Sequence, residues 1–291
     1  MNINMKYYIV TICAIFIALG VGMLVGFNLN YDQALSRQQS EVLESFNTEF
    51  DNLKDKNKAL QAEIDKMDGD ITKIEEYLQE NIDILTQDVL TGKNTGIILT
   101  SENNDYSEEI EEIISKANGT TSFNIVIKDS INNKDKISEI SDNLNESFKS
   151  SQDVINYIIN ALSTSKGHEQ LYALENLGVL KINSINEELY QSYDSVVLLG
   201  ELSGKDANTK FNAKEKLIID GLKEKNKYMV AATQSESNNT ILKLYSDNNI
   251  STIDNINEVI GKISLTTLLK NQNIVGHFGN SDVSKELIAF E

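Results

Sequence analysis

Hydrophobic and polar residues follow three different patterns in succession along the 291-residue chain. Residues 7–29 form an almost unbroken apolar run, and from Leu43 onward apolar residues recur at alternating spacings of three and four. From residue 96 onward, short apolar runs alternate with amphipathic stretches. These patterns predict a membrane-spanning helix, a long heptad helix and a distal α/β domain, in that order.

The apolar run is long enough to cross a membrane, because about 20 residues rising 1.5 Å each span a hydrocarbon core of roughly 30 Å. Tyr7, Tyr8 and Tyr31 stand at its ends, where aromatic residues anchor helices at the membrane surface. A cleaved signal peptide would have an apolar region of only about 7–15 residues, followed by a small-x-small cleavage site. Residues 26–30 offer no such site. We therefore expect an uncleaved transmembrane helix over residues 7–29.

The charges that flank the run predict its orientation. Lys6 and the amino terminus precede it, whereas the first basic residue after it is Arg37. The positive-inside rule then makes residues 1–6 a cytoplasmic stub and places the chain after about residue 30 outside the cytoplasm.

One face of the predicted span carries small residues at every fourth position, namely Ala14, Ala18, Gly22 and Gly26. Small side chains at this spacing let two helix backbones approach closely, which favours the packing of one span against another. The alternative explanation is the ordinary glycine and alanine content of membrane helices.

Residues 31–90 have the pattern of a coiled coil. Eleven of the thirteen a and d positions between Leu43 and Leu85 are apolar, which is typical of a narrow helix–helix seam. A single asparagine at an a position, here Asn57, commonly selects a two-stranded coil in register. The predicted interface consists of Leu43, Phe46, Phe50, Leu53, Asn57, Leu60, Ile64, Met67, Ile71, Ile74 and Leu78.

Two chains anchored in one membrane would form this coil in parallel, so we predict a parallel homodimer. The coil would be about 65 Å long and would act as a spacer. The stripe could instead pack on the chain's own globular domain. Like charges such as Glu63 and Asp68 would also face each other in a parallel pair, which counts against it.

Residues 95–291 have the pattern of an α/β domain. Strands are predicted at residues 96–100, 123–128, 195–200, 228–232 and 250–253, and helices at residues 107–116, 152–162, 213–225, 237–245 and 258–269. Continuous apolar strands between helices are typical of a mostly parallel sheet with helices on both faces. We therefore predict a three-layer, flavodoxin- or Rossmann-like domain. Such sheets bind ligands at the carboxyl ends of their strands, which singles out the loops 101–105, 201–206 and 233–237.

The chemistry of the chain points away from several classes of protein. With 44 acidic and 26 basic residues the net charge is −18, which argues against a nucleic-acid binder. The single cysteine, Cys13, lies in the predicted span, so neither a disulfide nor a thiol nucleophile serves the distal domain. Residues 200–206 have three residues between their glycines where a phosphate loop needs four, and no G-x-S-x-G motif occurs. We therefore expect a protein that is not an enzyme and has no cofactor.

His277 is the candidate metal ligand of the distal domain. It lies in the segment Gly276-His277-Phe278-Gly279, between two glycines near the end of the chain. A histidine in this position could be a metal ligand, a base or a packed loop residue.

The order of these parts resembles the mycobacterial copper transport protein (MctB) family over essentially the whole chain. The most specific resemblances are the IALGVGMLVG stretch of the predicted span and the closing Gly276-His277-Phe278-Gly279 segment. The resemblance implies a protein of the bacterial cell envelope. It also implies either copper handling or, as for a corynebacterial relative, a part in cell division as a membrane-anchored coiled-coil partner.

The residues help to weigh these two functions. Copper(I) prefers thiolate and thioether ligands, yet the five methionines do not cluster in the sequence. We therefore favour a coiled-coil-dimerised envelope scaffold whose α/β domain recruits or regulates an envelope or cell-division protein. Copper transport or homeostasis at the cell envelope, with copper as the bound metal, is the alternative.

Overall fold

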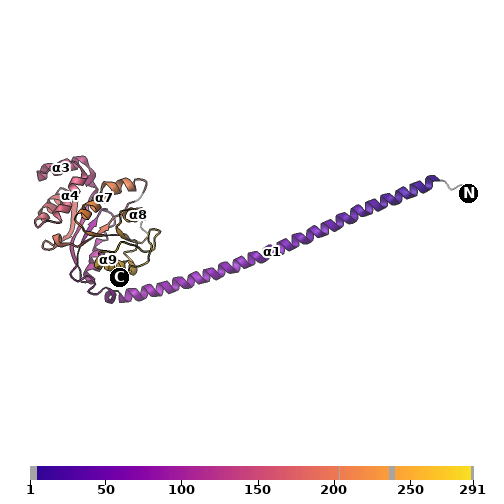
Figure 1. Ribbon diagram of the computed structural model, residues 1–291, viewed down its shortest axis with the longest axis horizontal. Helices are drawn as coiled ribbons and strands as arrows, with labels where there is room; N and C mark the ends of the chain where they lie inside the picture. The colour runs from indigo at the N-terminus through magenta and orange to yellow at the C-terminus, as the bar shows by residue number, and fades with distance from the viewer. Residues whose placement is uncertain (1–4, 203, 236–239, 290–291) are drawn as a thin grey trace. The chain divides into compact units, whose positions relative to one another are not determined.

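The computed structural model describes residues 5–202, 204–235 and 240–289, and Figure 1 shows its ribbon. For residues 29–34 only the backbone is described, so the side chain of Tyr31 lies outside the described part. The chain divides into two compact units, Met1–Thr72 and Lys73–Glu291. We call the second unit the head, and all the strands of the described chain belong to it.

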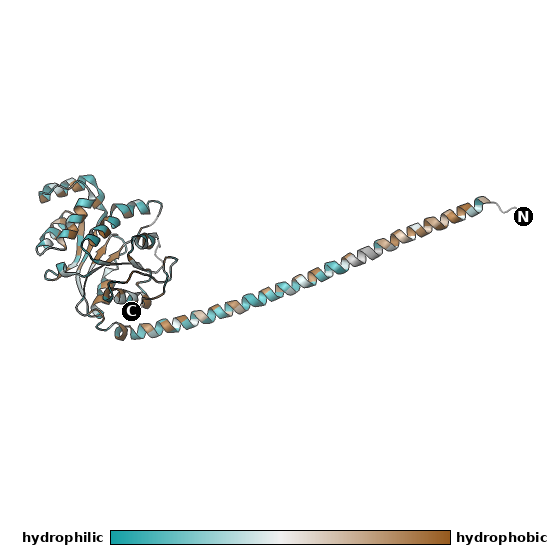
Figure 2. Ribbon diagram, in the orientation of Figure 1, coloured by the Kyte–Doolittle hydropathy of each residue, from teal (hydrophilic) through white to brown (hydrophobic). Residues whose placement is uncertain are grey.

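A single helix, α1 (Met5–Thr86), forms the whole described part of the first unit and enters the head. Its stretch Met5–Asn28 has a mean hydropathy of 2.6 and is long and apolar enough to cross a membrane. Figure 2 shows this stretch in brown, followed by a mostly hydrophilic stretch with intermittent brown residues. The predicted apolar N-terminal helix is therefore confirmed.

The head is built around one seven-stranded sheet with the order β3-β2-β1-β4-β5-β6-β7. Neighbouring strands run parallel, apart from β2 and β3, which pair antiparallel. The predicted mostly parallel sheet is thus confirmed. The strands are β1 (Asn94–Leu99), β2 (Thr120–Ile127), β3 (Leu180–Ile185), β4 (Ser195–Leu199), β5 (Tyr228–Ala232), β6 (Ser251–Ile253) and β7 (His277–Phe278).

Helices fill most connections between these strands, as short apolar strands separated by amphipathic stretches predict. They are α2 (Ser107–Lys116), η1 (Asp129–Asn132), α3 (Lys134–Leu144), α4 (Ser151–Ala161), α5 (Gly167–Asn176), η2 (Tyr190–Ser192), α6 (Ala207–Ala213), α7 (Glu215–Glu224), α8 (Thr240–Asp247) and α9 (Val259–Lys270). The predicted helix 213–225 corresponds to α7, which begins two residues later, and a further helix that was not predicted, α6, precedes it and meets it at Lys214. The first residues of the predicted helix 237–245 lie outside the described residues, and α8 is described from Thr240.

Side chains along β1 alternate between two apolar clusters, because successive residues of a strand point to opposite faces of the sheet. Ile97 and Leu99 belong to one cluster, together with residues of α2 and α9. Ile98 belongs to the other cluster, together with residues of α4, α7 and α8. The continuous apolar strands of the sequence therefore reflect burial on both faces of the sheet.

Asparagine closes several turns of the head. Asn118, Asn145, Asn226 and Asn249 follow α2, α3, α7 and α8, with φ angles of 60°, 53°, 55° and 57°. This left-handed region is open to glycine and, among other residues, favours asparagine. The sequence contains no proline, so the ends of these helices depend on asparagine instead.

Candidate functional site

The connections of the sheet change direction between β1 and β4. From β1 the chain crosses to β2 and β3 on one side, whereas from β4 it continues to β5, β6 and β7 on the other. The loops that leave β1 and β4 therefore diverge at the carboxyl ends of these strands. In open α/β sheets this is the place where a ligand-binding crevice forms.

A cavity of about 640 Å³ lies at this edge of the sheet. Its walls come from the loop after β1, the loop after β4, η1 and the junction of α6 with α7. The lining is polar and carries both signs of charge. Its main polar residues are Thr100, Asp129, Glu201, Lys210, Lys214 and Glu215.

Lys214, at the junction of α6 and α7, is buried with 3% of its surface exposed. Its ammonium donates hydrogen bonds to the carbonyl oxygens of Thr100 and Ile127, the latter at 3.4 Å. It also donates to the Asp129 carboxylate, with which it forms an ion pair. These three acceptors match the three N–H groups of an ammonium, so Lys214 ties the ends of β1 and β2 to η1.

Glu215 begins α7 and is 2% exposed. Both of its carboxylate oxygens are inaccessible to solvent, and neither forms a hydrogen bond of standard geometry with the residues that the structure describes. Burial raises the pKa of Glu215, while the charge of Lys214, the Glu215 backbone N–H and the hydroxyl of Thr100 oppose the rise. Buried carboxylates are normally paired or hydrogen-bonded, so this group is exceptional within the head.

The Tyr245 hydroxyl, on α8, is likewise buried without a hydrogen-bond partner in the described part of the chain. Burial raises the pKa of this phenol, and the charge of Glu215 adds to the rise. A Cβ atom at Gly200 would lie 2.5 Å from Thr100 Oγ1 and 3.4 Å from Tyr245 Oη, so the close approach requires glycine. We call Thr100, Glu215 and Tyr245 the cavity cluster.

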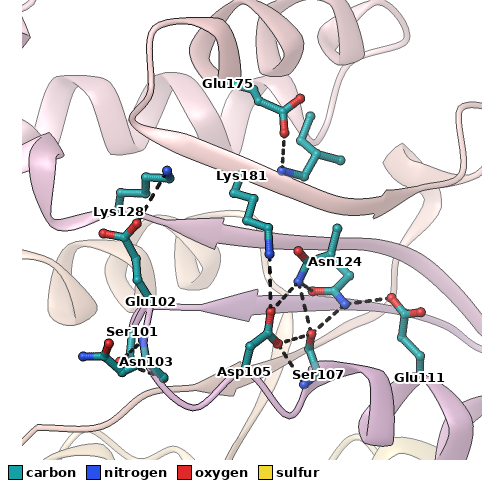
Figure 3. Close-up of polar contacts among 12 residues, drawn as sticks. Ser101, Glu102, Asn103, Asp105, Ser107, Glu111, Asn124, Lys128, Glu175 and Lys181 are labelled. Carbon is teal, nitrogen blue, oxygen red and sulfur yellow. Dashed lines mark hydrogen bonds and ion pairs between the residues drawn. The ribbon is translucent and has the colours of Figure 1, made fainter.

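The loop after β1 forms one wall of the cavity, and a second polar cluster holds its far end (Figure 3). Within this loop, the backbone N–H of Asn103 donates to Ser101 Oγ at 3.2 Å. Lys128, just beyond β2, forms an ion pair with Glu102 at 3.5 Å. These contacts fix the wall against the neighbouring strand.

The second cluster consists of Asp105, Ser107, Glu111, Asn124 and Asn183, and we call it the Asn124 cluster. Asn124 Nδ2 donates to Ser107 Oγ at 2.9 Å and to Glu111 Oε1 at 2.8 Å. Asn183 Nδ2 lies 3.3 Å from Asn124 Oδ1 and 3.0 Å from Asp105 Oδ2. Burial acts to raise the pKa of Asp105, but hydrogen bonds from Ser107 and Asn183 outweigh it and lower the pKa. Each member is hydrogen-bonded, and the cluster joins α2, β2 and β3.

The predicted metal candidate His277 lies on β7, and hydroxyl groups face both of its ring nitrogens. Nδ1 is 3.0 Å from Thr252 Oγ1, and Nε2 is 2.9 Å from Ser246 Oγ. Burial lowers the pKa of His277, and the positive charge of Lys285 lowers it further. Among the described residues, no group of three or more His, Cys, Asp or Glu side chains could hold a metal ion.

The two glycines that flank His277 are required by close packing within this segment. A Cβ atom at Gly276 would lie 2.4 Å from the ring of Phe278. Gly279 has φ +128°, and a Cβ atom there would lie 1.7 Å from Asp254 Oδ1. The Asp254 carboxylate accepts hydrogen bonds from the backbone N–H groups of Asn280 and Ser281, at 2.8 and 2.6 Å. The segment thus docks the end of the chain onto β6.

The predicted packing residues of the span and the coil all lie on α1. Ala14, Ala18, Gly22 and Gly26 are exposed, and a Cβ atom at Gly22 or Gly26 would meet nothing within 4 Å. The predicted interface residues between Leu43 and Ile74 are exposed as well. Their role as interfaces stays a prediction.

Sequence reasoning missed Lys214, Glu215 and Tyr245. A signal for Glu215 was present, because it shares one helical face with Ile218, Ile219 and Leu222 at spacings of three, four and seven. All four residues are buried in the structure. A charged residue in line with an apolar stripe therefore indicated a buried carboxylate.

The apolar stretch of α1 and the head together fit a membrane-anchored α/β protein. Residues 2–288 match the family described as "Copper transport outer membrane protein, MctB". Because the match covers nearly the whole chain, the chain belongs to the MctB family, as its sequence resemblance predicted. Among curated proteins, no sequence matches it significantly.

Proposed function

We propose that this MctB-family protein is a single-pass, non-catalytic scaffold of the cell envelope that forms a parallel homodimer through α1. Its N-terminus lies in the cytoplasm, and its head recruits or regulates an envelope or cell-division protein. The order of the parallel strands, β2-β1-β4-β5-β6, is that of flavodoxin-type sheets, which supports a doubly wound head.

The observation that carries this proposal is the exposed apolar stripe of α1. Phe46, Phe50, Leu53 and Leu60 have between 56% and 67% of their surface exposed. Large apolar side chains in a contiguous exposed row indicate an interaction surface. Their heptad spacing suits another narrow helix, and a second copy anchored in the same membrane supplies one in parallel.

Disulfide crosslinking of the full chain in membranes tests the dimer. In a Cys13→Ser background, Leu60→Cys places a thiol at a d position of the stripe, whereas Ala62→Cys places one at the opposite f position. We expect mild oxidation to link Leu60→Cys chains into dimers efficiently and Ala62→Cys chains poorly, because d residues meet across a parallel coil. Equal crosslinking at the two positions, or none at Leu60→Cys, would contradict the dimer.

The recruiting role needs a separate test in cells. Photocrosslinkers placed on exposed positions of the head should trap one recurrent envelope or division protein, and loss of the chain should mislocalise that protein. If every crosslinked product is a copy of this chain, the recruiting role is wrong while the dimer stands.

Copper transport or homeostasis is the second candidate, and the description of the family is what favours it. Against it, both ring nitrogens of His277 lie within hydrogen-bond distance of hydroxyls. Copper binding would break at least one of these contacts.

A competition titration of the full chain with Cu(I) decides between the two functions. His277→Ala is compared with His168→Ala, which removes the other histidine of the chain. Tight stoichiometric binding that only His277→Ala abolishes would establish copper handling. Binding no tighter than that of a weak chelator would leave the scaffold as the function of this chain.

A further inference from the structure

We propose that the groove between the end of α1 and α2 receives the side chain of Tyr77 from a second copy of this chain. The inference rests on the proposed dimer and adds the contact that holds each head against its partner's helix. The groove and Tyr77 both lie in the head, which begins at Lys73.

The groove has a volume of about 280 Å³ and combines apolar with charged side chains. Ile82 of α1 and Ile113 of α2 line it, together with Asp83, Glu109, Glu112, Lys116 and Lys262. Both lysines form ion pairs with glutamates of α2, at 2.8 and 3.1 Å, so a charged occupant is not required. An aromatic ring with a polar end suits such a lining, and tyrosine is a side chain of this kind.

Tyr77 is exposed on a face of α1 that a partner helix would cover. It has 65% of its surface exposed, and Ile84, one heptad later, has 73%. Both stand at g positions of the heptads in which Leu78 and Leu85 are a residues. In a parallel coil a g side chain packs beside the e residue five positions further along the partner. For Tyr77 that residue is Ile82, which lines the groove.

Tyr77 cannot fill the groove of its own chain. Two residues at about 100° each place it on nearly the opposite side of α1 from Gln79, which also lines the groove. A second copy in parallel has no such restriction, because its g residues approach from across the seam.

The g and e positions change in chemistry at this part of the helix. In the preceding heptad a parallel pair would bring Asp70 beside Glu75, and these like charges repel. Tyr77 beside Ile82 is instead an apolar pair, so the flank of the coil becomes attractive where the groove begins. We therefore expect the contact beside the heads to supply much of the affinity of the dimer.

Photocrosslinking of the full chain in membranes tests the contact. p-Benzoylphenylalanine replaces Tyr77 in an isotopically light chain, which is reconstituted together with an isotopically heavy chain without a crosslinker. We expect mass spectrometry to find residue 77 of the light chain joined to residues 109–116 of the heavy chain. The same crosslinker in place of Glu76, at an exposed f position, should not reach α2 of the heavy chain.

Variants of Tyr77 measure what the contact contributes. Tyr77→Ala should weaken dimerisation by about ten-fold or more in sedimentation equilibrium of the full chain in detergent micelles, because aromatic anchors often dominate an interface. Tyr77→Phe keeps the ring and should retain most of the affinity. Glu76→Ala is the matched control and should leave the affinity unchanged.

The outcomes separate this contact from the dimer itself. If Leu60→Cys chains form disulfide-linked dimers but the crosslinker at position 77 labels no part of the partner's α2, the dimer stands and the groove contact is wrong. If neither crosslink forms, the dimer and the contact fail together. Equal losses of affinity in Glu76→Ala and Tyr77→Ala would also overturn the contact.

Discussion

The β1–α2 loop runs between two polar clusters that differ in how their buried groups are satisfied. In the Asn124 cluster at the far end of the loop, each amide, hydroxyl and carboxylate has a hydrogen-bond partner. In the cavity cluster at the near end, Glu215 and Tyr245 have none among the described residues. The first cluster is fully hydrogen-bonded, whereas the second holds buried polar groups whose hydrogen bonds are incomplete.

The largest effect should come from Lys214→Met, which removes the ammonium beside the cavity cluster. Two strand-end carbonyls lose a donor, and Glu215 loses the charge that offsets its burial. We expect the free energy of unfolding to fall by about 3 kcal/mol, measured by urea unfolding followed through tyrosine circular dichroism. Lys225→Met, on the exposed end of the same region, is the control. A loss below about 0.5 kcal/mol would mean that the junction is held by other contacts.

A somewhat smaller loss is expected from Asn124→Ala in the satisfied cluster. The change removes one donor each from Ser107 and Glu111 and one acceptor from Asn183. Ser184 still donates to Glu111, and Asn183 still donates to Asp105. The free energy of unfolding should fall by about 2 kcal/mol, in the same urea measurement. Asn143→Ala removes an exposed hydrogen bond on α3 and should change it by less than about 0.5 kcal/mol. Equal losses for the two variants would show that the buried hydrogen bonds of Asn124 stabilise the head no more than an exposed hydrogen bond on α3 does.

Glu215→Gln should have the opposite sign, and its effect should depend on pH. Because burial raises the pKa of Glu215 above its usual 4.5, the folded head binds this proton more tightly than the unfolded chain does. The wild type therefore loses stability as the pH rises from about 4.5 through the raised pKa. The variant should melt at a higher temperature at pH 8, by about 2–4 °C per kcal/mol relieved, and the gain should shrink towards pH 4.5. A lower melting temperature at pH 8 would show that Glu215 is already paired.

The smallest effect should come from Asp129→Asn. Asp129 pairs with buried Lys214, but its own side chain is 85% exposed, so water screens the pair. We expect the free energy of unfolding to change by less than about 0.5–1 kcal/mol in urea. A loss as large as that of Lys214→Met would place the stabilising contact of Lys214 at Asp129 rather than at the strand ends.

The sequence predicted most of the fold, because the central strands are apolar on both faces and their helices carry clear apolar stripes. The helix at residues 107–116 matches α2 residue for residue. The missed strands lie at the two edges of the sheet. Along β3 buried residues are few, which hides the strand pattern, and β7 is only two residues long.

The cavity cluster was harder to predict, since its members are far apart in the sequence. The loops 101–105 and 201–206 were predicted as ligand-binding, and residues of both line the cavity, although Ser203 lies outside the described residues. Lys214 and Glu215 were missed because the charges of the predicted helix 213–225 were interpreted as solvated. Backbone angles of φ −140° and ψ −67° at Lys214 separate α6 from α7 and place both residues at the wall of the cavity.

The turns closed by left-handed asparagines also affect how the chain folds. Slow refolding phases of tens of seconds commonly arise when an X–Pro bond isomerises. Because asparagine and glycine take the turn positions and the chain has no proline, no such bond exists. Refolding of the head should therefore lack a prolyl-isomerase-sensitive phase, and its rate should be set by the assembly of the parallel strands.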